Sequence, residues 1–223
     1  HHLSHLTGAY YTSHNNFIGK EVLGFSADGS GDNVSATVSI INGNNIERIA
    51  ETGRSASLGK LYSRMTFYMG MKPHEHEFKL MGLAPYAYEK EVNRVKELFY
   101  KVLDCDKDEL VFKLQSETSM NNIYDYLHEK MGGIRFDVQA GAIQKFTEEI
   151  LVKWVKAAIL KTGIRNIVLS GGVFMNVKAN MIISQLDEVD SIYVMPSCGD
   201  ESLPIGAALR VYYEKTQIKD FSK

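Results

Sequence analysis

The sequence predicts an α/β fold, and three observations support this expectation. Polar and apolar residues alternate over residues 34–40, which is the period-two pattern of a half-buried strand. An apolar stripe at helical spacing runs through residues 138–159 and predicts a long helix. A buried strand at 166–170 then leads into two glycines and further helix and strand segments. This alternation favours a sheet covered by helices, with strand ends that meet in one crevice.

The 223-residue chain is long enough for one large domain or two small lobes. Its net charge of −2 argues against nucleic acid or an anionic membrane as a partner. No apolar run approaches the roughly 18 residues that cross a bilayer, and no secretory signal is recognisable. The two cysteines, Cys105 and Cys198, do not make a disulfide framework. We therefore expect a cytoplasmic protein with no nucleic-acid or membrane partner.

The first third of the chain predicts strands. Residues 22–26 are a short apolar run that ends at the segment 28–32, where Asp and Gly predict a tight turn. The alternating strand at 34–40 follows. Asn and Gly at 42–45 then predict a second turn before a returning strand at 46–50.

Helices dominate the middle of the chain. Apolar residues recur at helical spacing over 58–68, with Gly70 as a stop signal, and again over 92–103. The segment 104–136 carries mixed signals, and we assign no element there. Beyond the long helix and the strand at 166–170, the predicted elements are a helix from Val177, a strand at 191–195 and a helix at 203–212.

Histidines open the chain at a spacing that suits a metal ion. His1 and His5 lie four residues apart and so share one face of a helix, where two imidazoles can bind one ion. A terminal histidine pair is also typical of an affinity tag. A tag, however, does not continue into helix-like sequence such as residues 6–11, which favours the metal interpretation.

A glycine-rich segment follows the first predicted strand. Here Asp28 can reach a cation, while Gly29, Ser30 and Gly31 offer backbone N–H groups as a nest for phosphate. The alternative is an ordinary hairpin turn, since Asp and Gly are common in those as well.

A second pair of glycines, Gly171 and Gly172, separates the strand at 166–170 from the next helix. Glycines at such a connection let a ligand approach the backbone closely. A tight connection without a ligand is the alternative. The dinucleotide-binding pattern needs three spaced glycines and does not match this segment.

Two charged segments complete the candidates. Asp200 follows the last predicted strand, where a carboxylate can bind a metal or orient a nucleotide. Its neighbour Cys198 is better explained as a small buried thiol than as a nucleophile. His, Glu and Lys are dense over residues 74–79, before an apolar loop with Gly and Pro; a solvated charged surface is the alternative there.

Taken in their order along the chain, these segments resemble the carbamoyltransferase family that includes nodulation and antibiotic-tailoring O-carbamoyltransferases. The matching motifs are His-His-Leu-x-His from His1, Asp-Gly-x-Gly-Asp from Asp28, Glu-x-Lys-Leu-Met-Gly-Leu-Ala-Pro-Tyr from Glu77, Gly-Gly-Val-x-x-Asn from Gly171, and Gly-Asp before Gly-Ala-Ala from Gly199. They span nearly the whole chain, and the block at 77–86 is too long for a chance match.

The resemblance implies an actin-like ATPase (ribonuclease H-like) fold, with a mixed sheet and flanking helices, related to the tRNA threonylcarbamoyl-transfer protein. Residues 1–55 would be the remainder of a first lobe and residues 56–223 mostly the second lobe. It also implies truncation at the N-terminus, with the catalytic base in a missing strand, and a missing adenylate-forming domain. The fragment is then expected to be inactive by itself.

In such proteins, two histidines and two aspartates hold a metal ion, and the matching residues are His1, His5, Asp28 and Asp200. Iron is the expected metal, with zinc, manganese or magnesium as alternatives. His2 would pack behind the ligands or make a supporting hydrogen bond.

The implied function is an O-carbamoyltransferase core that binds ATP-derived carbamoyl-adenylate and passes the carbamoyl group to a hydroxyl acceptor. Carbamoyl phosphate and ATP would be the other substrates, and the metal would polarise the adenylate phosphate. The implied nucleotide- and phosphate-binding residues are Gly29, Ser30, Gly31, Lys79, Gly171, Gly172 and Asn176.

Two alternatives stay open. The same fold can serve a tRNA adenosine or a thiol as acceptor, although the balanced charge argues against tRNA. A truncated module can also bind a nucleotide without catalysis. An exposed apolar sheet edge would then favour a homo-oligomer.

Overall fold

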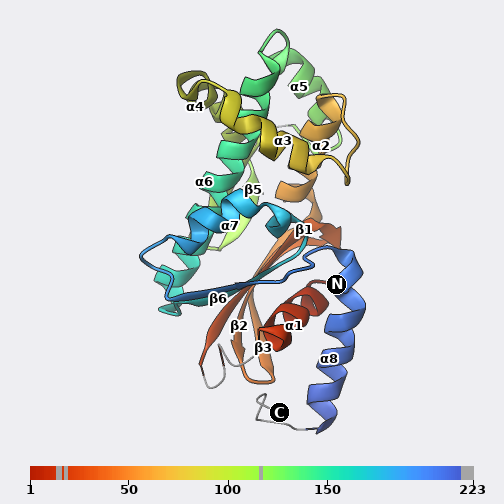
Figure 1. Ribbon diagram of the computed structural model, residues 1–223, viewed down its shortest axis with the longest axis vertical. Helices are drawn as coiled ribbons and strands as arrows, with labels where there is room; N and C mark the ends of the chain where they lie inside the picture. The colour runs from red at the N-terminus through yellow and green to blue at the C-terminus, as the bar shows by residue number, and fades with distance from the viewer. Residues whose placement is uncertain (14–16, 18–19, 116–117, 217–223) are drawn as a thin grey trace.

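The computed structural model describes residues 1–13, 17, 20–115 and 118–216, and it has the predicted α/β architecture (Figure 1). Five strands form one sheet in the order β3-β2-β1-β6-β7. The first three are antiparallel neighbours, whereas β1, β6 and β7 are parallel, so the sheet is mixed. The strands are β1 (Val22–Gly31), β2 (Val34–Asn42), β3 (Asn45–Gly53), β6 (Asn166–Ser170) and β7 (Ser191–Val194).

Helices cover both faces of this sheet. Successive residues of a strand point to opposite faces. At Gly24, an added Cβ would lie 2.9 Å from Leu6 of α1, whereas the next residue, Phe25, packs its ring 5.0 Å from Trp154 of α6. These contacts place α1 and α6 on opposite faces. The helices around the sheet are α1 (His2–Thr12), α6 (Phe136–Thr162), α7 (Val177–Ser184) and α8 (Leu203–Thr216).

The other end of the molecule is mostly helical (Figure 1). The N-terminal half of α6 extends away from the sheet and carries smaller elements around it. Trp154 joins the two ends, because its indole N–H donates to the Leu110 carbonyl at 2.7 Å beside a small hairpin. These elements are α2 (Leu58–Tyr68), α3 (Glu77–Leu83), α4 (Glu89–Tyr100), β4 (Leu103–Asp106), β5 (Val111–Leu114) and α5 (Ile123–Met131).

Two predicted boundaries are wrong. The segment 28–32 is not the turn, because β1 continues to Gly31 and the chain reverses at Asp32 and Asn33, both with positive φ. The β1–β2 register shifts between Ala27 and Gly31, and this irregularity accommodates the polar and glycine residues within the strand. The helix predicted at 92–103 covers Glu89–Tyr100 instead, since Leu103 already belongs to β4.

The predicted division at residue 55 crosses the sheet. Strands β1–β3 come from 1–55 and strands β6 and β7 from 56–223, yet all five share one sheet. The assignment of lobes therefore stays a prediction. Among the described residues, no helix is long and apolar enough to span a bilayer.

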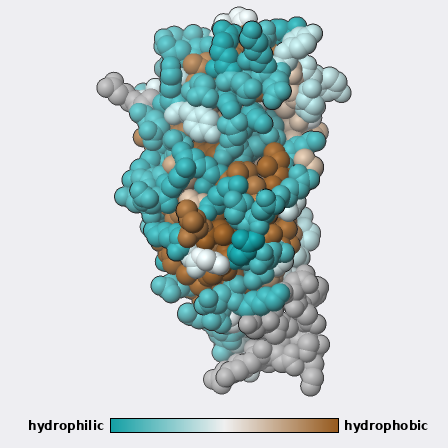
Figure 2. Space-filling view, turned by 90° about the vertical axis from the view of Figure 1, so that its left-hand side faces the viewer, coloured by the Kyte–Doolittle hydropathy of each residue, from teal (hydrophilic) through white to brown (hydrophobic). Residues whose placement is uncertain are grey.

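A shallow hollow of about 780 Å³ lies beside the C-terminal half of α6. Its apolar lining residues include Val152, Leu160 and Ile182, and lysines and glutamates line it as well. Figure 2 shows hydrophobic side chains gathered at mid-height on the side of the molecule that is on the left in Figure 1. The lining residues Gly163 and Arg165 precede β6, so the hollow lies at the edge where β6 begins. The predicted binding residues Gly171 and Gly172 follow the other end of β6.

Candidate metal centre

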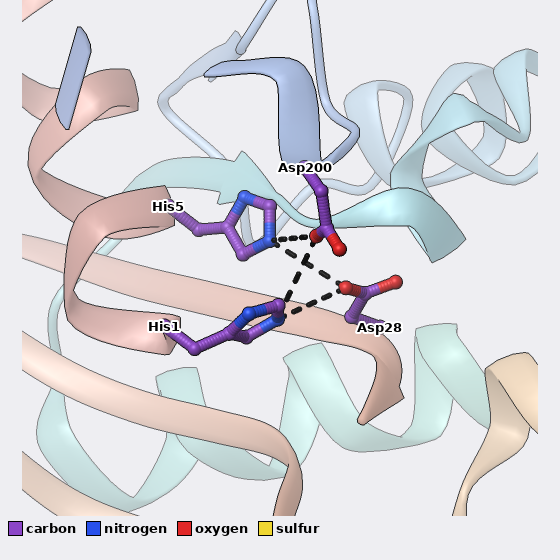
Figure 3. A group of neighbouring side chains, drawn as sticks. All are labelled: His1, His5, Asp28 and Asp200. Carbon is purple, nitrogen blue, oxygen red and sulfur yellow. Dashed lines mark hydrogen bonds and ion pairs between the residues drawn. The ribbon is translucent and has the colours of Figure 1, made fainter. Parts of the chain in front are cut away.

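The parallel strands bring the predicted metal ligands to one edge of the sheet. Asp28 lies near the carboxyl end of β1, and Asp200 begins the 3₁₀ turn η5 (Asp200–Ser202) that follows β7. Gly24, Ser26 and Asp28 share one sheet face by the two-residue period, and that face carries α1. His1 is the N-cap residue of α1 and His5 lies in its first turn, so four side chains from three segments point toward one another (Figure 3).

The four side chains offer two nitrogen and two oxygen atoms that all lie within 4.8 Å of one another. The His1 Nε2 atom is 3.0 Å from an Asp28 oxygen and 3.8 Å from an Asp200 oxygen. For the His5 Nε2 atom, the corresponding distances are 3.5 and 3.4 Å. At metal–donor distances of about 2.0–2.2 Å, neighbouring donors lie roughly 2.8–3.1 Å apart in an octahedral site and roughly 3.3–3.6 Å apart in a tetrahedral one. The donor spacing therefore fits a single ion.

The His5 ring gives the strongest indication of a metal. This side chain is only 1% exposed, yet neither of its nitrogens has a hydrogen-bond partner among the described residues. Leaving a buried polar group without a partner costs about 1–3 kcal/mol. A cation bound at Nε2 would satisfy that nitrogen, and a set of imidazole and carboxylate ligands suits iron, zinc or manganese. The residues present therefore fit a metal ion.

The pKa values of the two carboxyl groups are shifted in opposite directions. Burial opposes ionisation of Asp28, but the adjacent His5 imidazole and the Gly29 N–H hold the pKa of its carboxyl below its usual range. Desolvation and the Asp28 charge raise the pKa of the Asp200 carboxyl. A bound cation would remove the repulsion between the two carboxylates. The site is thus electrostatically prepared for positive charge.

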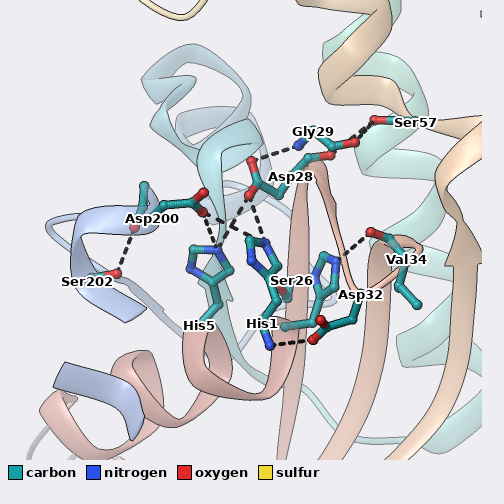
Figure 4. A network of polar contacts seen from close by, with 12 residues as sticks. His1, His5, Ser26, Asp28, Gly29, Asp32, Val34, Ser57, Asp200 and Ser202 are labelled. Atoms are coloured by element: carbon teal, nitrogen blue, oxygen red, sulfur yellow. Dashed lines mark hydrogen bonds and ion pairs between the residues drawn. The ribbon is translucent and has the colours of Figure 1, made fainter. Parts of the chain in front are cut away.

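Polar contacts around the group extend to Val34 and to Ser57 (Figure 4). His2 packs its ring edge-on against that of His1, with the ring centroids 4.9 Å apart. It is 2% exposed; its Nε2 lies 3.0 Å from the Val34 carbonyl and its Nδ1 2.8 Å from the Ser26 hydroxyl. A carbonyl only accepts, so Nε2 carries the proton and Nδ1 accepts from Ser26. Burial lowers the pKa of the His2 imidazole, which keeps it neutral in this role.

Glycines let the ligands approach one another. A Cβ at Gly31 would lie 2.0 Å from the His1 ring, so the ring packs directly on the β1 backbone. A Cβ at Gly172 would lie 2.8 Å from an Asp28 carboxylate oxygen. Gly171 has a φ of +94°, and a Cβ there would lie 2.3 Å from the Ala27 carbonyl oxygen. The two predicted glycine segments therefore meet around Asp28.

Two residues at the start of α2, which the sequence did not identify as part of the site, contact the Asp28–Gly29 backbone. Ser57 is the N-cap of α2, and its hydroxyl contacts the carbonyl oxygens of Asp28 at 3.1 Å and Gly29 at 2.7 Å. A Cβ at Gly59 would lie 2.8 Å from the Asp28 carbonyl. A serine immediately before an apolar helical stripe is a cap signal, and it predicts the helix start but not this tertiary contact.

The other predicted binding residues lie outside the four-ligand group. Gly29 donates its N–H to Asp28 at 2.7 Å, and Ser30 is exposed. Asn176 caps α7 and forms a reciprocal amide pair with Gln144, at 2.9 and 3.0 Å. Lys79 is exposed on α3, with its amine 5.9 Å from the Phe78 ring centroid. Nucleotide binding by these residues stays a prediction.

Cys198 is buried beside Asp200, as expected of a packing thiol. Its Sγ contacts the Met195 carbonyl at 3.0 Å, and burial raises the pKa of the thiol to about 12. Burial raises the pKa of the Cys105 thiol to about 12 as well. Neither environment activates a nucleophile, because the reactive form is the thiolate.

The thiols are expected to resist alkylation in the folded chain. Only the thiolate reacts, and at pH 8 a thiol with a pKa of about 12 is ionised to about one part in ten thousand. We expect iodoacetamide to modify both cysteines at least about 1,000-fold more slowly in the native chain than in urea, measured by mass spectrometry over time. Rapid modification of Cys105 in the native chain would show that its buried surroundings open to solvent.

Comparison with known proteins identifies the family. Residues 1–209 match the family model described as "Carbamoyltransferase N-terminus". An uncharacterized protein of Methanocaldococcus jannaschii, MJ1051, is 34% identical over 94% of this chain, and nodulation protein NolNO of Sinorhizobium fredii is 29% identical over 97% of it. The aligned region covers only 39% and 31% of those two proteins, so this chain spans well under half of their length.

Solved structures show the same fold at low sequence identity. Full-length HypF matches with a TM-score of 0.52 and 16% identity, covering 95% of this chain and 42% of HypF. Component A of (R)-2-hydroxyglutaryl-CoA dehydratase from Acidaminococcus fermentans matches with a TM-score of 0.54 and 14% identity, covering 97% of this chain and 69% of that one. The predicted actin-like ATPase fold is confirmed. By its family match over residues 1–209, the chain belongs to the carbamoyltransferase family.

Proposed function

We propose that this chain is the metal-binding core of an O-carbamoyltransferase. The single observation that carries the proposal is the convergence of His1, His5, Asp28 and Asp200 at the carboxyl ends of β1 and β7, in a chain of the carbamoyltransferase family. A metal bound there, iron by expectation, supplies Lewis-acid polarisation of a phosphate oxygen. The substrates would be carbamoyl-adenylate, derived from carbamoyl phosphate and ATP, and a hydroxyl acceptor.

The residues of the chain would bind and orient the adenylate. Gly172 borders the carboxylate of Asp28, where a phosphate group would lie, and the N–H groups of Ser30 and Gly31 follow Asp28 in the chain and would donate to that phosphate. HypF, which shares the fold, was solved in a phosphate- and nucleotide-bound form, and this supports the choice of a nucleotide. The Asn176 side-chain carbonyl accepts from Gln144 and from the Ala179 N–H, and its amide donates one hydrogen to Gln144, so the second amide hydrogen would serve a nucleoside.

The test is product analysis with the protein that carries this sequence. It is incubated with labelled carbamoyl phosphate, ATP and separate hydroxyl, thiol and tRNA acceptors, and products are identified by mass spectrometry. We expect a carbamoyl ester with a hydroxyl acceptor. Asp200→Ala should lower ester formation by more than about 100-fold, because removal of a metal ligand costs more than the 10–100-fold typical of outer-shell partners.

Other outcomes distinguish the alternatives. A product formed on the thiol or on the tRNA would show that the fold serves that acceptor instead of a hydroxyl. Nucleotide binding without any turnover would identify a non-catalytic module. Equal ester formation by wild type and Asp200→Ala would separate the metal centre from the reaction.

A further inference from the structure

The carboxylate of Asp28 divides its two oxygens between two kinds of partner. Its Oδ1 accepts the backbone N–H of Gly29 at 2.7 Å. Its Oδ2 lies 3.0 Å from the His1 Nε2 atom and 3.5 Å from the His5 Nε2 atom. Oδ2 is therefore the oxygen that faces the two histidines, and a bound cation would contact Asp28 through it.

This division depends on the orientation of one peptide unit. The Asp28 carbonyl and the Gly29 N–H belong to the same planar peptide, so a rotation of that unit turns the N–H away from Oδ1. Glycine permits such a rotation, because it has no Cβ. In the described part of the sheet, the residue pairs between β1 and β2 skip from Ala27 to Gly31, and those between β1 and β6 end at Ser26. The orientation of the peptide therefore depends on contacts from outside the strand pairing.

The start of α2 supplies such contacts. The Ser57 hydroxyl donates toward the Gly29 carbonyl at 2.7 Å and the Asp28 carbonyl at 3.1 Å. These carbonyls belong to the peptides on either side of Gly29, so one hydroxyl limits rotation at that residue. A Cβ at Gly59 would lie 2.8 Å from the Asp28 carbonyl oxygen and 2.9 Å from the Gly29 nitrogen. The helix start thus packs directly on the peptide whose N–H holds Oδ1.

The Ser57 hydroxyl is itself held in place. Ser57 is the N-cap of α2, and its oxygen accepts the Lys60 N–H at 3.0 Å. The residue is 0% exposed, so water does not compete for the hydroxyl. One side chain therefore connects the rigid first turn of a helix to the backbone that carries Asp28.

We propose that Ser57 is a positioning residue of the metal centre. Its hydroxyl fixes the Asp28–Gly29 peptide, the Gly29 N–H then holds Oδ1, and Oδ2 is presented to the cation. Groups that hydrogen-bond behind metal ligands orient those ligands and raise the affinity for the metal. The inference rests on the metal centre of the proposed function, but not on the transfer of a carbamoyl group.

The test is the Zn²⁺ affinity of the chelator-treated protein, measured at pH 7 by competition with a chromophoric chelator. We expect Ser57→Ala to weaken Zn²⁺ binding about tenfold. This is the lower end of the range for groups behind metal ligands, because Ser57 acts through a peptide and not on the carboxylate itself. The metal-free variant should also melt about 2–4 °C below wild type, since it loses a helix cap.

Ser35→Ala is the matched control for the loss of stability. Ser35 is 2% exposed, and its hydroxyl also contacts two consecutive carbonyls, those of Thr52 at 3.3 Å and Gly53 at 3.1 Å on β3. The same chemical change there should lower the melting temperature by a similar amount. The Zn²⁺ affinity should stay within about twofold of wild type, because these carbonyls do not belong to the segment that carries Asp28.

Ser57→Gly separates the hydroxyl from the helix cap. Glycine is nearly as favourable as serine at an N-cap, so this variant should melt closer to wild type than Ser57→Ala does. It lacks the hydroxyl all the same, and we expect it to lose as much Zn²⁺ affinity as Ser57→Ala.

Four outcomes would overturn the inference. These are wild-type protein that binds no Zn²⁺, full Zn²⁺ affinity in Ser57→Ala, affinity regained in Ser57→Gly, and an equal loss of affinity in Ser35→Ala. The third would assign the effect to the helix cap and the fourth to general stability. A protein that shows the expected affinities but transfers no carbamoyl group would refute the proposed function and leave the role of Ser57 intact.

Discussion

Replacing His5 by alanine is expected to lower the metal affinity of the chain by more than about 100-fold, since outer-shell changes alone cost 10–100-fold. His5 is fully enclosed by α1 and the sheet edge, and its ring nitrogens make no hydrogen bond within the described residues. Asp200→Ala should have an effect of the same order, because its oxygen lies 3.4 Å from the same His5 nitrogen.

Elemental analysis after dialysis against a fixed concentration of free metal measures this effect. His128→Ala and Asp125→Ala are the matched controls, since both residues are exposed on α5. They should retain the wild-type metal content. Full metal content in His5→Ala would contradict the assignment of the centre, whereas loss in both His5→Ala and Asp200→Ala ties together residues from opposite ends of the sequence.

The stability of the metal-free chain should respond in the opposite direction. In the absence of a cation, the Asp200 carboxylate faces that of Asp28, and desolvation and this repulsion raise the pKa of Asp200. Asp200→Asn removes the repelled charge and should leave the metal-free chain as stable as wild type or more stable at pH 7. The same substitution weakens metal binding. Opposite signs in the two measurements distinguish a ligand from a residue that merely stabilises the fold.

Local sequence patterns predicted most of the fold because they report on neighbours along the chain. The alternation that predicts β2 and the apolar stripe that predicts α6 both reflect burial of one face, and both elements are present. The predicted end of β1 was wrong because Asp28, Gly29 and Gly31 are residue types typical of turns, yet here they lie inside a strand. The irregular β1–β2 pairing that accommodates them depends on the partner strand.

The candidate site, too, could be predicted only in part from local sequence. Spacing alone paired His1 with His5, whereas Asp28 and Asp200 joined them through family resemblance, because nothing local indicates that the ends of β1 and β7 share an edge. Ser57 was not identified as part of the site, because a cap signal indicates where a helix starts and not which backbone its hydroxyl contacts.

The close crossing of α1 and α8 explains how residues so distant in sequence meet. Gly206 of α8 packs on the Ser4 carbonyl, and its own carbonyl accepts the Thr7 hydroxyl at 2.9 Å. Asp200 lies in the turn that leads directly into α8. The distance between the helix axes therefore determines whether Asp200 reaches His5.

Gly206→Ala is expected to destabilise the chain by about 2–3 kcal/mol, at the upper end of the range for overpacking. The added Cβ would lie 1.9 Å from the Ser4 carbonyl oxygen and 3.0 Å from the Gly8 nitrogen. Both neighbours are backbone atoms of α1, so only a shift of one helix relieves the contact. Since that shift carries Asp200 away from the histidines, added metal should raise the melting temperature less than in wild type.

Gly82→Ala provides the control, because it makes the same chemical change in open space. Gly82 lies in α3, and a Cβ there would meet nothing within 4 Å. Alanine in an exposed helix is favoured over glycine by about 0.5–1 kcal/mol, so this variant should be more stable than wild type, with the metal-induced shift unchanged. Denaturant unfolding with and without metal measures both quantities. If Gly206→Ala also gains stability or keeps the full metal-induced shift, the helix crossing does not position Asp200.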